Sequence, residues 1–208
     1  PKLFTLLCNG ITEQVLEFLD FQICQNQENV EQQLQEKNFA YLPLDVISPI
    51  LSDLINLRNV MGLRSPIHTL ARLINPFNAK ATMQAIFHPA YRSSHQQAAF
   101  QLGYKNSAVI KGEGGEFERN PDAKTLICGI QNGELYEHEL PKLTDNRSPI
   151  EEELNLDVFK AVWEGKQSHE YGEIAVIETI GIALYTMGVC TNFNDAMLKA
   201  KELWQHKH

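Results

Sequence analysis

The chain has 208 residues, of which 43% are hydrophobic and 21% are charged. This composition is typical of a globular protein that can bury a sizeable core. The formal net charge of −8 argues against a protein that coats nucleic acid with its whole surface, although a local basic patch is compatible with it. There is no signal-peptide pattern, and no apolar run approaches the roughly 18 residues of a membrane helix. We therefore expect no membrane partner.

The four cysteines, Cys8, Cys24, Cys128 and Cys190, are widely scattered, without a CxxC pair or Cys/His ligand spacing. This pattern predicts reduced thiols in the core of a cytoplasmic protein. The chain opens on Pro1 directly into an apolar run, which predicts a start in mid-domain and hence a fragment or a processed chain.

The first part of the chain predicts strands alternating with helices. The apolar runs at 3–8 and 39–44 predict strands. Thr12 is expected to cap a first helix, and Asn29 a polar helix at 30–37. Asp45 is expected to cap one long helix at 46–61, in spite of Pro49 near its first turn.

The stretch from Leu57 to Phe77 is broken twice, at Gly62 and at Asn75-Pro76. Ser65 is a good N-cap, and Pro66 occupies the first helical position, where proline is tolerated. Four apolar residues then follow at helical spacing; they are Ile67, Leu70, Leu73 and Ile74.

This stretch also carries basic residues. Arg64, His68 and Arg72 are spaced four apart and so predict one helix face, and Arg58 lies just upstream of the first break. A helix start flanked by arginines is a candidate anion site. A solvated basic face is an equally favoured interpretation on spacing alone.

The second part of the chain continues the alternation. Strands are expected at 82–87, 107–111, 124–130 and 134–138, the last two joined by the hairpin signal Gln131-Asn132-Gly133. Helices are expected at 91–102, 156–164, 171–187 and 193–205. The whole pattern predicts an α/β fold with a mostly parallel sheet, an added antiparallel hairpin and helices on both faces.

The strand at 107–111 runs into a glycine-rich loop, Gly112–Glu116, a position where α/β folds place ligand contacts. Carboxylates beside this loop, Glu113, Glu116 and Glu118, could hold Mg²⁺ against a phosphate. A solvated acidic turn is the favoured interpretation of these residues on their own.

The order of these elements resembles the anthranilate phosphoribosyltransferase family, glycosyltransferase family 3, nearly from end to end. The most specific parts are LRNVMGLRSPIHTLARLINP, where the enzymes carry a pattern like vRxxLGxRTxFNxLGPLxNP, and VIKGEGGEFE, where they carry vHGxxGxDE. The resemblance implies the large α/β domain of that fold over 1–208. The small helical domain and the phosphate loop would lie upstream of Pro1, so the chain is expected to be a fragment.

The resemblance implies a role for some residues and departs from the enzymes at others. Arg58 matches an arginine that contacts the aromatic acceptor, Asn75 is retained, and Glu118 matches the second acid of the metal pair. The first acid is replaced by Phe117. Further departures fall at the acceptor site; they are Ser48-Pro49, His68 and Ala71-Arg72.

These departures look more like the YbiB-type relatives, for which the resemblance implies nucleic-acid binding. The favoured hypothesis is a diverged homologue that binds a phosphate-rich ligand, nucleic acid, through Arg58, Arg64, His68, Arg72 and Asn75. The alternative is an active Mg²⁺-dependent phosphoribosyltransferase that uses phosphoribosyl pyrophosphate (PRPP) and anthranilate or another small aromatic acceptor. A structural fragment without activity is the third. The full-length protein is expected to form a homodimer, as family members commonly do.

Overall fold

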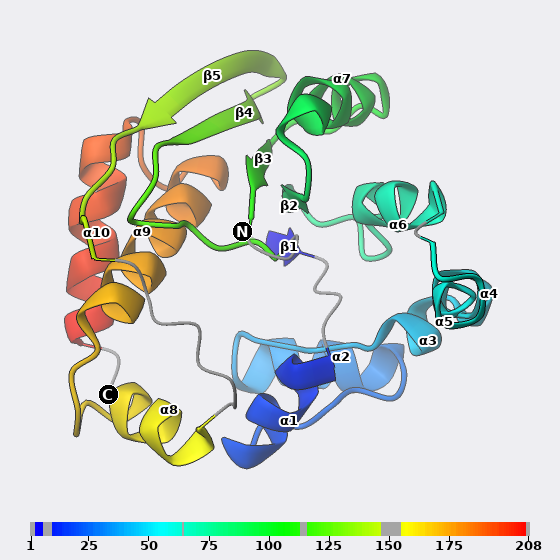
Figure 1. Ribbon diagram of the computed structural model, residues 1–208, viewed down its shortest axis with the longest axis horizontal. Coiled ribbons are helices and arrows are strands. Elements are labelled where there is room, and N and C mark those ends of the chain that lie inside the picture. Colours follow the sequence, from blue (N-terminus) through cyan, green and yellow to red (C-terminus); the bar gives the residue numbers. More distant parts are fainter. Residues whose placement is uncertain (1–2, 6–9, 64, 113–115, 147–154, 207–208) are drawn as a thin grey trace. The chain divides into compact units, whose positions relative to one another are not determined.

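The computed structural model describes residues 3–5, 10–63, 65–112, 116–146 and 155–206 (Figure 1). The chain divides into two compact units. One unit comprises Pro1–Leu6 and Phe77–His208, and we call it the sheet unit. The other comprises Leu7–Pro76, and we call it the helical unit. Each is described by itself.

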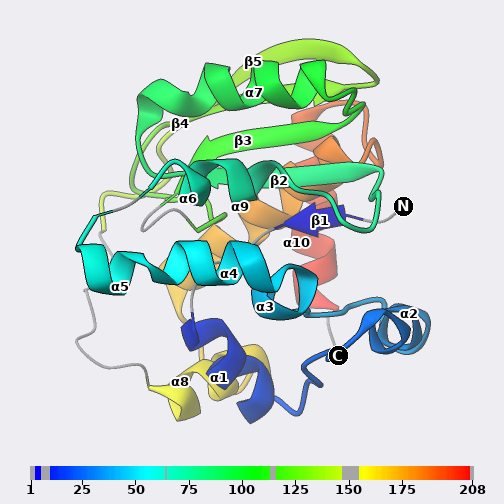
Figure 2. The same cartoon turned by 90° about the vertical axis from the view of Figure 1, so that its right-hand side faces the viewer.

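The sheet unit is built on five strands in the order β1-β2-β3-β4-β5. The strands are β1 (Leu3–Thr5), β2 (Ala81–Ile86), β3 (Ser107–Lys111), β4 (Thr125–Gln131) and β5 (Glu134–Leu140). Strands β1, β2 and β3 are parallel, whereas β4 pairs antiparallel with β3 and with β5. Figure 2 shows them in this order.

The turn between β4 and β5 follows from two residues. Asn132 has φ 52° and Gly133 has φ 85°. Two consecutive left-handed residues suit the right-handed twist of a two-residue hairpin, and Asn-Gly adopts them readily. The predicted hairpin is therefore confirmed.

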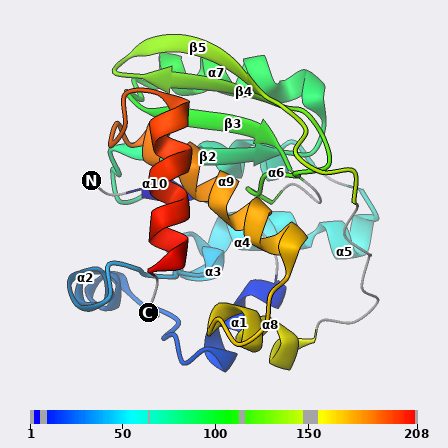
Figure 3. The same cartoon turned by 90° about the vertical axis from the view of Figure 1, so that its left-hand side faces the viewer.

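Helices cover both faces of this sheet. On one face, α7 (Arg92–Gln101) packs against β3 and β4, after the short 3-10 turn η2 (Pro89–Tyr91). On the other face, α9 (Glu170–Thr186) lies against the sheet and α10 (Phe193–Gln205) packs outside α9, as Figures 1 and 3 show. Helix α8 (Leu156–Trp163) precedes α9. The predicted α/β class, with an antiparallel hairpin and helices on both faces, is confirmed. The sheet itself is mixed, with two parallel pairs and two antiparallel pairs of strands, where a mostly parallel sheet was predicted.

The core of the sheet unit lies between the strands and α9. Strand β2 is buried along its whole length, as expected for a parallel strand covered on both faces. Its Met83 and Ala85 pack with Ile110 of β3, Ile127 of β4 and Ile182 of α9.

The helical unit is a succession of short helices. They are α1 (Gly10–Phe18), α2 (Gln27–Glu36), α3 (Leu44–Ile47), α4 (Pro49–Asn56), α5 (Arg58–Met61), α6 (Ile67–Leu70) and the 3-10 turn η1 (Ala71–Leu73). The strand predicted at 39–44 is wrong, since it is reduced to one bridge between Tyr41 and Ile23. The caps predicted for the first two helices are also wrong. Helix α1 begins at Gly10, and the side chain of Asn26 caps α2.

The long helix predicted from 46 to 61 is divided into α3, α4 and α5, with one break at Ser48-Pro49 and another at Leu57. Pro49 accounts for the first break. Proline lacks the N–H that would continue the helix, so a new helix starts there instead. Ser48, in extended conformation, accepts a hydrogen bond from the Leu51 N–H with its Oγ at 3.4 Å and caps α4. Pro49 then occupies the first position of α4, where it is well tolerated.

The described cysteines, Cys24, Cys128 and Cys190, are free thiols, and Cys24 and Cys128 are buried; Cys8 lies outside the described residues. Burial raises the pKa of the Cys24 and Cys128 thiols, so both are poor nucleophiles. Within the described part of the chain, no helix is both long enough and apolar enough to cross a membrane.

Candidate functional site

The segment from Leu57 to Phe77 is broken at the two predicted points. Helix α5 ends at Gly62, which is left-handed with φ 69°, a conformation that glycine adopts without steric cost. The second short helix, α6, passes directly into η1, and the chain becomes extended at Ile74, just before Asn75-Pro76.

The start of α6 differs from the prediction. The residue that precedes it is Pro66, which has helical angles, and no side chain caps the helix. Instead, Nδ1 of His68 lies 3.2 Å from the Ser65 N–H and 3.3 Å from Ser65 Oγ. The predicted Ser65 cap is therefore wrong. The His68 side chain instead stabilises the turn by accepting the hydrogen bond from the Ser65 N–H. Because Nδ1 is engaged, a ligand contact of His68 would come from Nε2.

The predicted basic face is only partly described. Arg64 lies outside the described residues. Arg58 is exposed on α5, whereas Arg72 in η1 and Asn75 are half-buried. The spacing of four residues does not trace one regular helix face here, because α6 has only four residues and η1 turns more tightly. With a helix this short, the macrodipole adds little to anion binding.

The glycine-rich loop begins where the parallel strands β2 and β3 end. The Gly112 N–H donates to the Ile86 carbonyl at 3.2 Å, which joins the ends of the two strands. A Cβ on Gly112 would overlap the carbonyl oxygen of Glu116, so only glycine permits this close return of the backbone. Residue Glu113 of the predicted acidic set lies outside the described residues.

The residues after this loop bear on metal binding. Phe117 is 7% exposed and packs in the core with Met83, Ala108 and Ile110. Glu118 is exposed, and its N–H donates to the Glu116 carbonyl at 3.1 Å. The position that carries the first metal acid in the resembling enzymes is thus a core aromatic. Of the acid pair that the resemblance implies for Mg²⁺, the described residues keep the second acid, Glu118, and carry Phe117 in place of the first.

Arg119 anchors the segment that follows Glu118. Its side chain is fully buried, and its guanidinium donates to the carbonyls of Asn120, Ala123 and Pro141. Its backbone N–H donates to Thr179 Oγ1 of α9 at 3.0 Å. In the sequence, an arginine next to Asn-Pro in a loop is typical of the surface. No sequence signal therefore predicted that Arg119 would be buried.

Arg119 also faces a carboxylate, Glu178 of α9, with Nε 3.9 Å from Oε2. Burial lowers the pKa of Arg119 in spite of the opposing effect of Glu178, and burial raises the pKa of Glu178 in spite of Arg119. A strong ion pair would raise the pKa of the arginine and lower that of the glutamate, and both shifts here have the opposite sign. Desolvation therefore outweighs the attraction between Arg119 and Glu178 at this distance. The carbonyl hydrogen bonds are what hold Arg119 in place.

The predicted residues fall into both units. Arg58, His68, Arg72 and Asn75 belong to the helical unit, and Glu118 belongs to the sheet unit. Among the residues that the structure describes, no group of three His, Cys, Asp or Glu side chains is placed to hold a metal ion.

Three further histidines make local contacts. Nδ1 of His88 accepts from the Ala90 N–H and Nδ1 of His169 accepts from the Gly172 N–H, so each caps a helix start. The ring of His138 stacks on Phe193 with centroids 4.0 Å apart.

A mixed sheet with helices on both faces, opening at the ends of its parallel strands into a glycine-led loop, defines an α/β domain of the phosphoribosyltransferase-like class. The family model described as "Glycosyl transferase family, a/b domain" matches residues 9–206. The chain therefore belongs to this glycosyltransferase family, as the sequence motifs predicted.

Several anthranilate phosphoribosyltransferases are similar to this chain. The enzyme from Metallosphaera sedula is 24% identical over 194 residues, which cover 90% of this chain and 57% of that protein. The crystal structure of the Thermus thermophilus enzyme superposes with a TM-score of 0.74 at 21% identity, over 93% of this chain and 59% of that one. The Saccharomyces cerevisiae enzyme in complex with PRPP and Mg has a TM-score of 0.66 at 14% identity, over 92% and 57%. The chain thus spans somewhat more than half the length of these relatives.

Proposed function

We propose that this chain is the α/β part of a diverged glycosyltransferase-family homologue that binds a phosphate-rich ligand, nucleic acid, without metal-dependent transfer. The observation that carries the proposal is the burial of Phe117 in the core. Transfer from a diphosphate donor depends on Mg²⁺ and fixed cations to neutralise the leaving pyrophosphate. A buried phenyl ring at the first acid position removes one of the groups that would hold that ion.

Phosphate binding is supported by the basic residues of the 57–77 segment. Arg58 is exposed, and Arg72 replaces the proline of the enzymes' motif with a half-buried guanidinium. A guanidinium near the acceptor position disfavours a flat apolar ring and favours an anion, to which it can donate two parallel hydrogen bonds. Arg64, His68 and Asn75 complete the proposed contact set. The net charge of −8 opposes binding over the whole surface, so the proposal confines contacts to this segment.

The test is a fluorescence titration of the full-length protein with single-stranded DNA at several salt concentrations. Arg58→Ala and Arg72→Ala should each weaken binding and lower the slope of log K against log salt by about 0.7, the effect of one lost single-strand phosphate contact. Lys201→Ala, an exposed lysine on α10, serves as the matched control and should leave both unchanged. Absence of binding at low salt would rule out the nucleic-acid proposal.

A second candidate is an active phosphoribosyltransferase, favoured by the relatives that bind PRPP and Mg. It is tested by following PRPP consumption with anthranilate in the presence of Mg²⁺, again on the full-length protein. Turnover that stops when Mg²⁺ is chelated would replace the first proposal. The homodimer and the cytoplasmic location remain predictions; light scattering of the full-length protein tests the former.

A further inference from the structure

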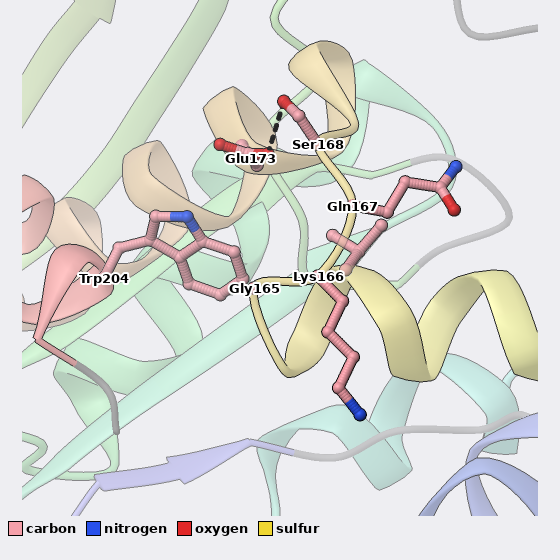
Figure 4. Close-up of a pocket in the computed structure, with 7 residues that line it drawn as sticks. Gly165, Lys166, Gln167, Ser168, Glu173 and Trp204 are labelled. Carbon is pink, nitrogen blue, oxygen red and sulfur yellow. Dashed lines mark hydrogen bonds between the residues drawn. The ribbon is translucent and has the colours of Figure 1, made fainter.

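The sheet unit contains a pocket of about 250 Å³ at the point where α8 and α10 end and α9 begins. It is lined by Val162, Gly165, Lys166, Gln167, Ser168, Glu173 and Trp204. Figure 4 shows the Trp204 indole on one side, the turn from Gly165 to Gln167 on the other, and the hydrogen-bonded pair of Ser168 and Glu173 above them. None of these residues belongs to the candidate site described above.

The backbone donors of the turn after α8 are already used. The turn after α8 is closed by N–H groups of Gly165, Lys166 and Gln167, which donate back to carbonyls of α8 at 2.8–3.1 Å. The N–H of His169 donates to Glu173 Oε1 at 3.0 Å. Free backbone N–H groups are what make a loop or helix start attractive to anions. Here these donors are occupied, and the pocket is poorly suited to a phosphate or carboxylate.

The charges at the pocket favour a cation. Lys166 Nζ lies 2.6 Å from Glu164 Oε2, and its side chain extends away from Glu173 (Figure 4). Glu173 Oε1 accepts from Ser168 Oγ at 2.9 Å, which fixes the carboxylate at the pocket. The C-terminal ends of α8 and α10 carry partial negative charge here, and the N-terminal end of α9 carries partial positive charge. The charge that favours a cation is therefore the Glu173 carboxylate.

The half-buried Trp204 adds an aromatic surface to the pocket. The face of an indole ring attracts cations through its quadrupole, and the ring also offers apolar area for an alkyl chain. Val162 adds a second apolar surface. An aromatic wall beside a fixed carboxylate is the arrangement that recognises an ammonium group with a short hydrocarbon tail.

We propose that this pocket binds a small organic cation, a primary alkylammonium, with its charge toward Glu173 and its chain on Trp204. The volume of about 250 Å³ admits a ligand of only a few carbon atoms. The site is independent of the proposed anion site, because it rests on different residues and on the opposite ligand charge.

The experiment compares three probes of the same length and different charge, n-butylammonium, butanol and butyrate, by ligand-observed NMR on the full-length protein at low salt. The proposal requires n-butylammonium to bind and the other two to bind at least about tenfold more weakly. Butyrate binding as tightly as n-butylammonium, equal binding of all three, or no binding of n-butylammonium would each overturn it.

Two variants locate the site. Glu173→Gln keeps the acceptor oxygen that Ser168 and His169 use and removes only the charge, so n-butylammonium should bind about tenfold more weakly. Glu170→Gln makes the same charge change at an exposed position one turn earlier on α9 and should leave binding unchanged. Trp204→Leu should weaken binding about two- to fivefold. Equal effects of the two glutamate variants would point to general charge attraction and overturn the assignment to this pocket.

Discussion

Replacing Arg119 by methionine should lower the free energy of unfolding by about 3–5 kcal/mol, the usual effect of removing one partner from a buried charged network. Methionine has a similar length and fills the space with an apolar chain. The change leaves the carbonyls of Asn120, Ala123 and Pro141 without their guanidinium donor. It also leaves Glu178 without the facing cation.

The magnitude follows from two opposing contributions. Three hydrogen bonds from a charged donor contribute about 1.5–3 kcal/mol each, hence about 4.5–9 kcal/mol together. Against this, methionine relieves the desolvation of a guanidinium whose side chain is fully buried, and the lowered pKa of Arg119 shows that this desolvation exceeds the attraction to Glu178. A few kcal/mol of relief brings the net loss to the stated range.

Urea unfolding followed by circular dichroism measures the effect, with two comparison variants. Arg119→Lys keeps the charge but cannot reach three carbonyls with one ammonium group, and it should lie between the wild type and Arg119→Met. Lys124→Met removes the exposed ion pair in which Nζ lies 2.9 Å from Glu139 Oε1, and should cost less than about 1 kcal/mol. If Arg119→Met is no more destabilising than Lys124→Met, the reasoning from burial is wrong.

Three further changes test other parts of the sheet unit. Burial raises the pKa of Glu178 above the ordinary 4.5, so the folded state binds the Glu178 proton more tightly than the unfolded state does. The free energy of unfolding should therefore fall as pH rises from 4.5 through the folded pKa. In urea titrations at several pH values, Glu178→Gln should lack this part of the pH dependence. An identical pH slope in the variant would contradict the assignment. A Cβ at Gly129 would overlap the ring of Tyr136, so Gly129→Ala should cost about 1–3 kcal/mol and lower the thermal midpoint; an unchanged midpoint would mean that the ring moves aside freely. Phe117→Asp buries a carboxylate in the core and should cost more than about 3 kcal/mol, and thermal unfolding should be no more sensitive to MgCl₂ than in the wild type; strong stabilisation by Mg²⁺ would show that the position can still hold the metal.

The elements that the sequence predicted best are those whose ends are set by residues within the element or next to it. Strand β3 has the predicted bounds, as does α10. For α10, Asn192 gives the start, because its Oδ1 accepts from the Asp195 N–H at 2.9 Å. The β4–β5 turn needs only Asn132-Gly133. Capping and turn chemistry act within a few residues, so they can be read without knowledge of the rest of the fold.

Two of the predictions that failed depended on competition between local signals. Apolar periodicity over 46–61 favoured one helix, but Pro49 and the Ser48 cap divided it. The cap expected from Ser65 is absent. Instead Nδ1 of His68, three residues further on, accepts a hydrogen bond from the Ser65 N–H. When two residues within one turn could each cap or break a helix, the sequence does not show which one does. The outcome depends on small differences in backbone geometry.

The sequence by itself identified the family, because the motifs around Arg58 to Asn75 and the glycine-led loop are specific and contiguous. It also predicted the order of strands and helices in the sheet unit. It also showed that Phe117 replaces an acid. Only the tertiary structure decided that Phe117 is a core residue, that Arg119 is buried against three carbonyls, and that Glu173 and Trp204 share a pocket. Burial and proximity are set by which distant segments pack together, and that information is not contained in the spacing of residues along the chain.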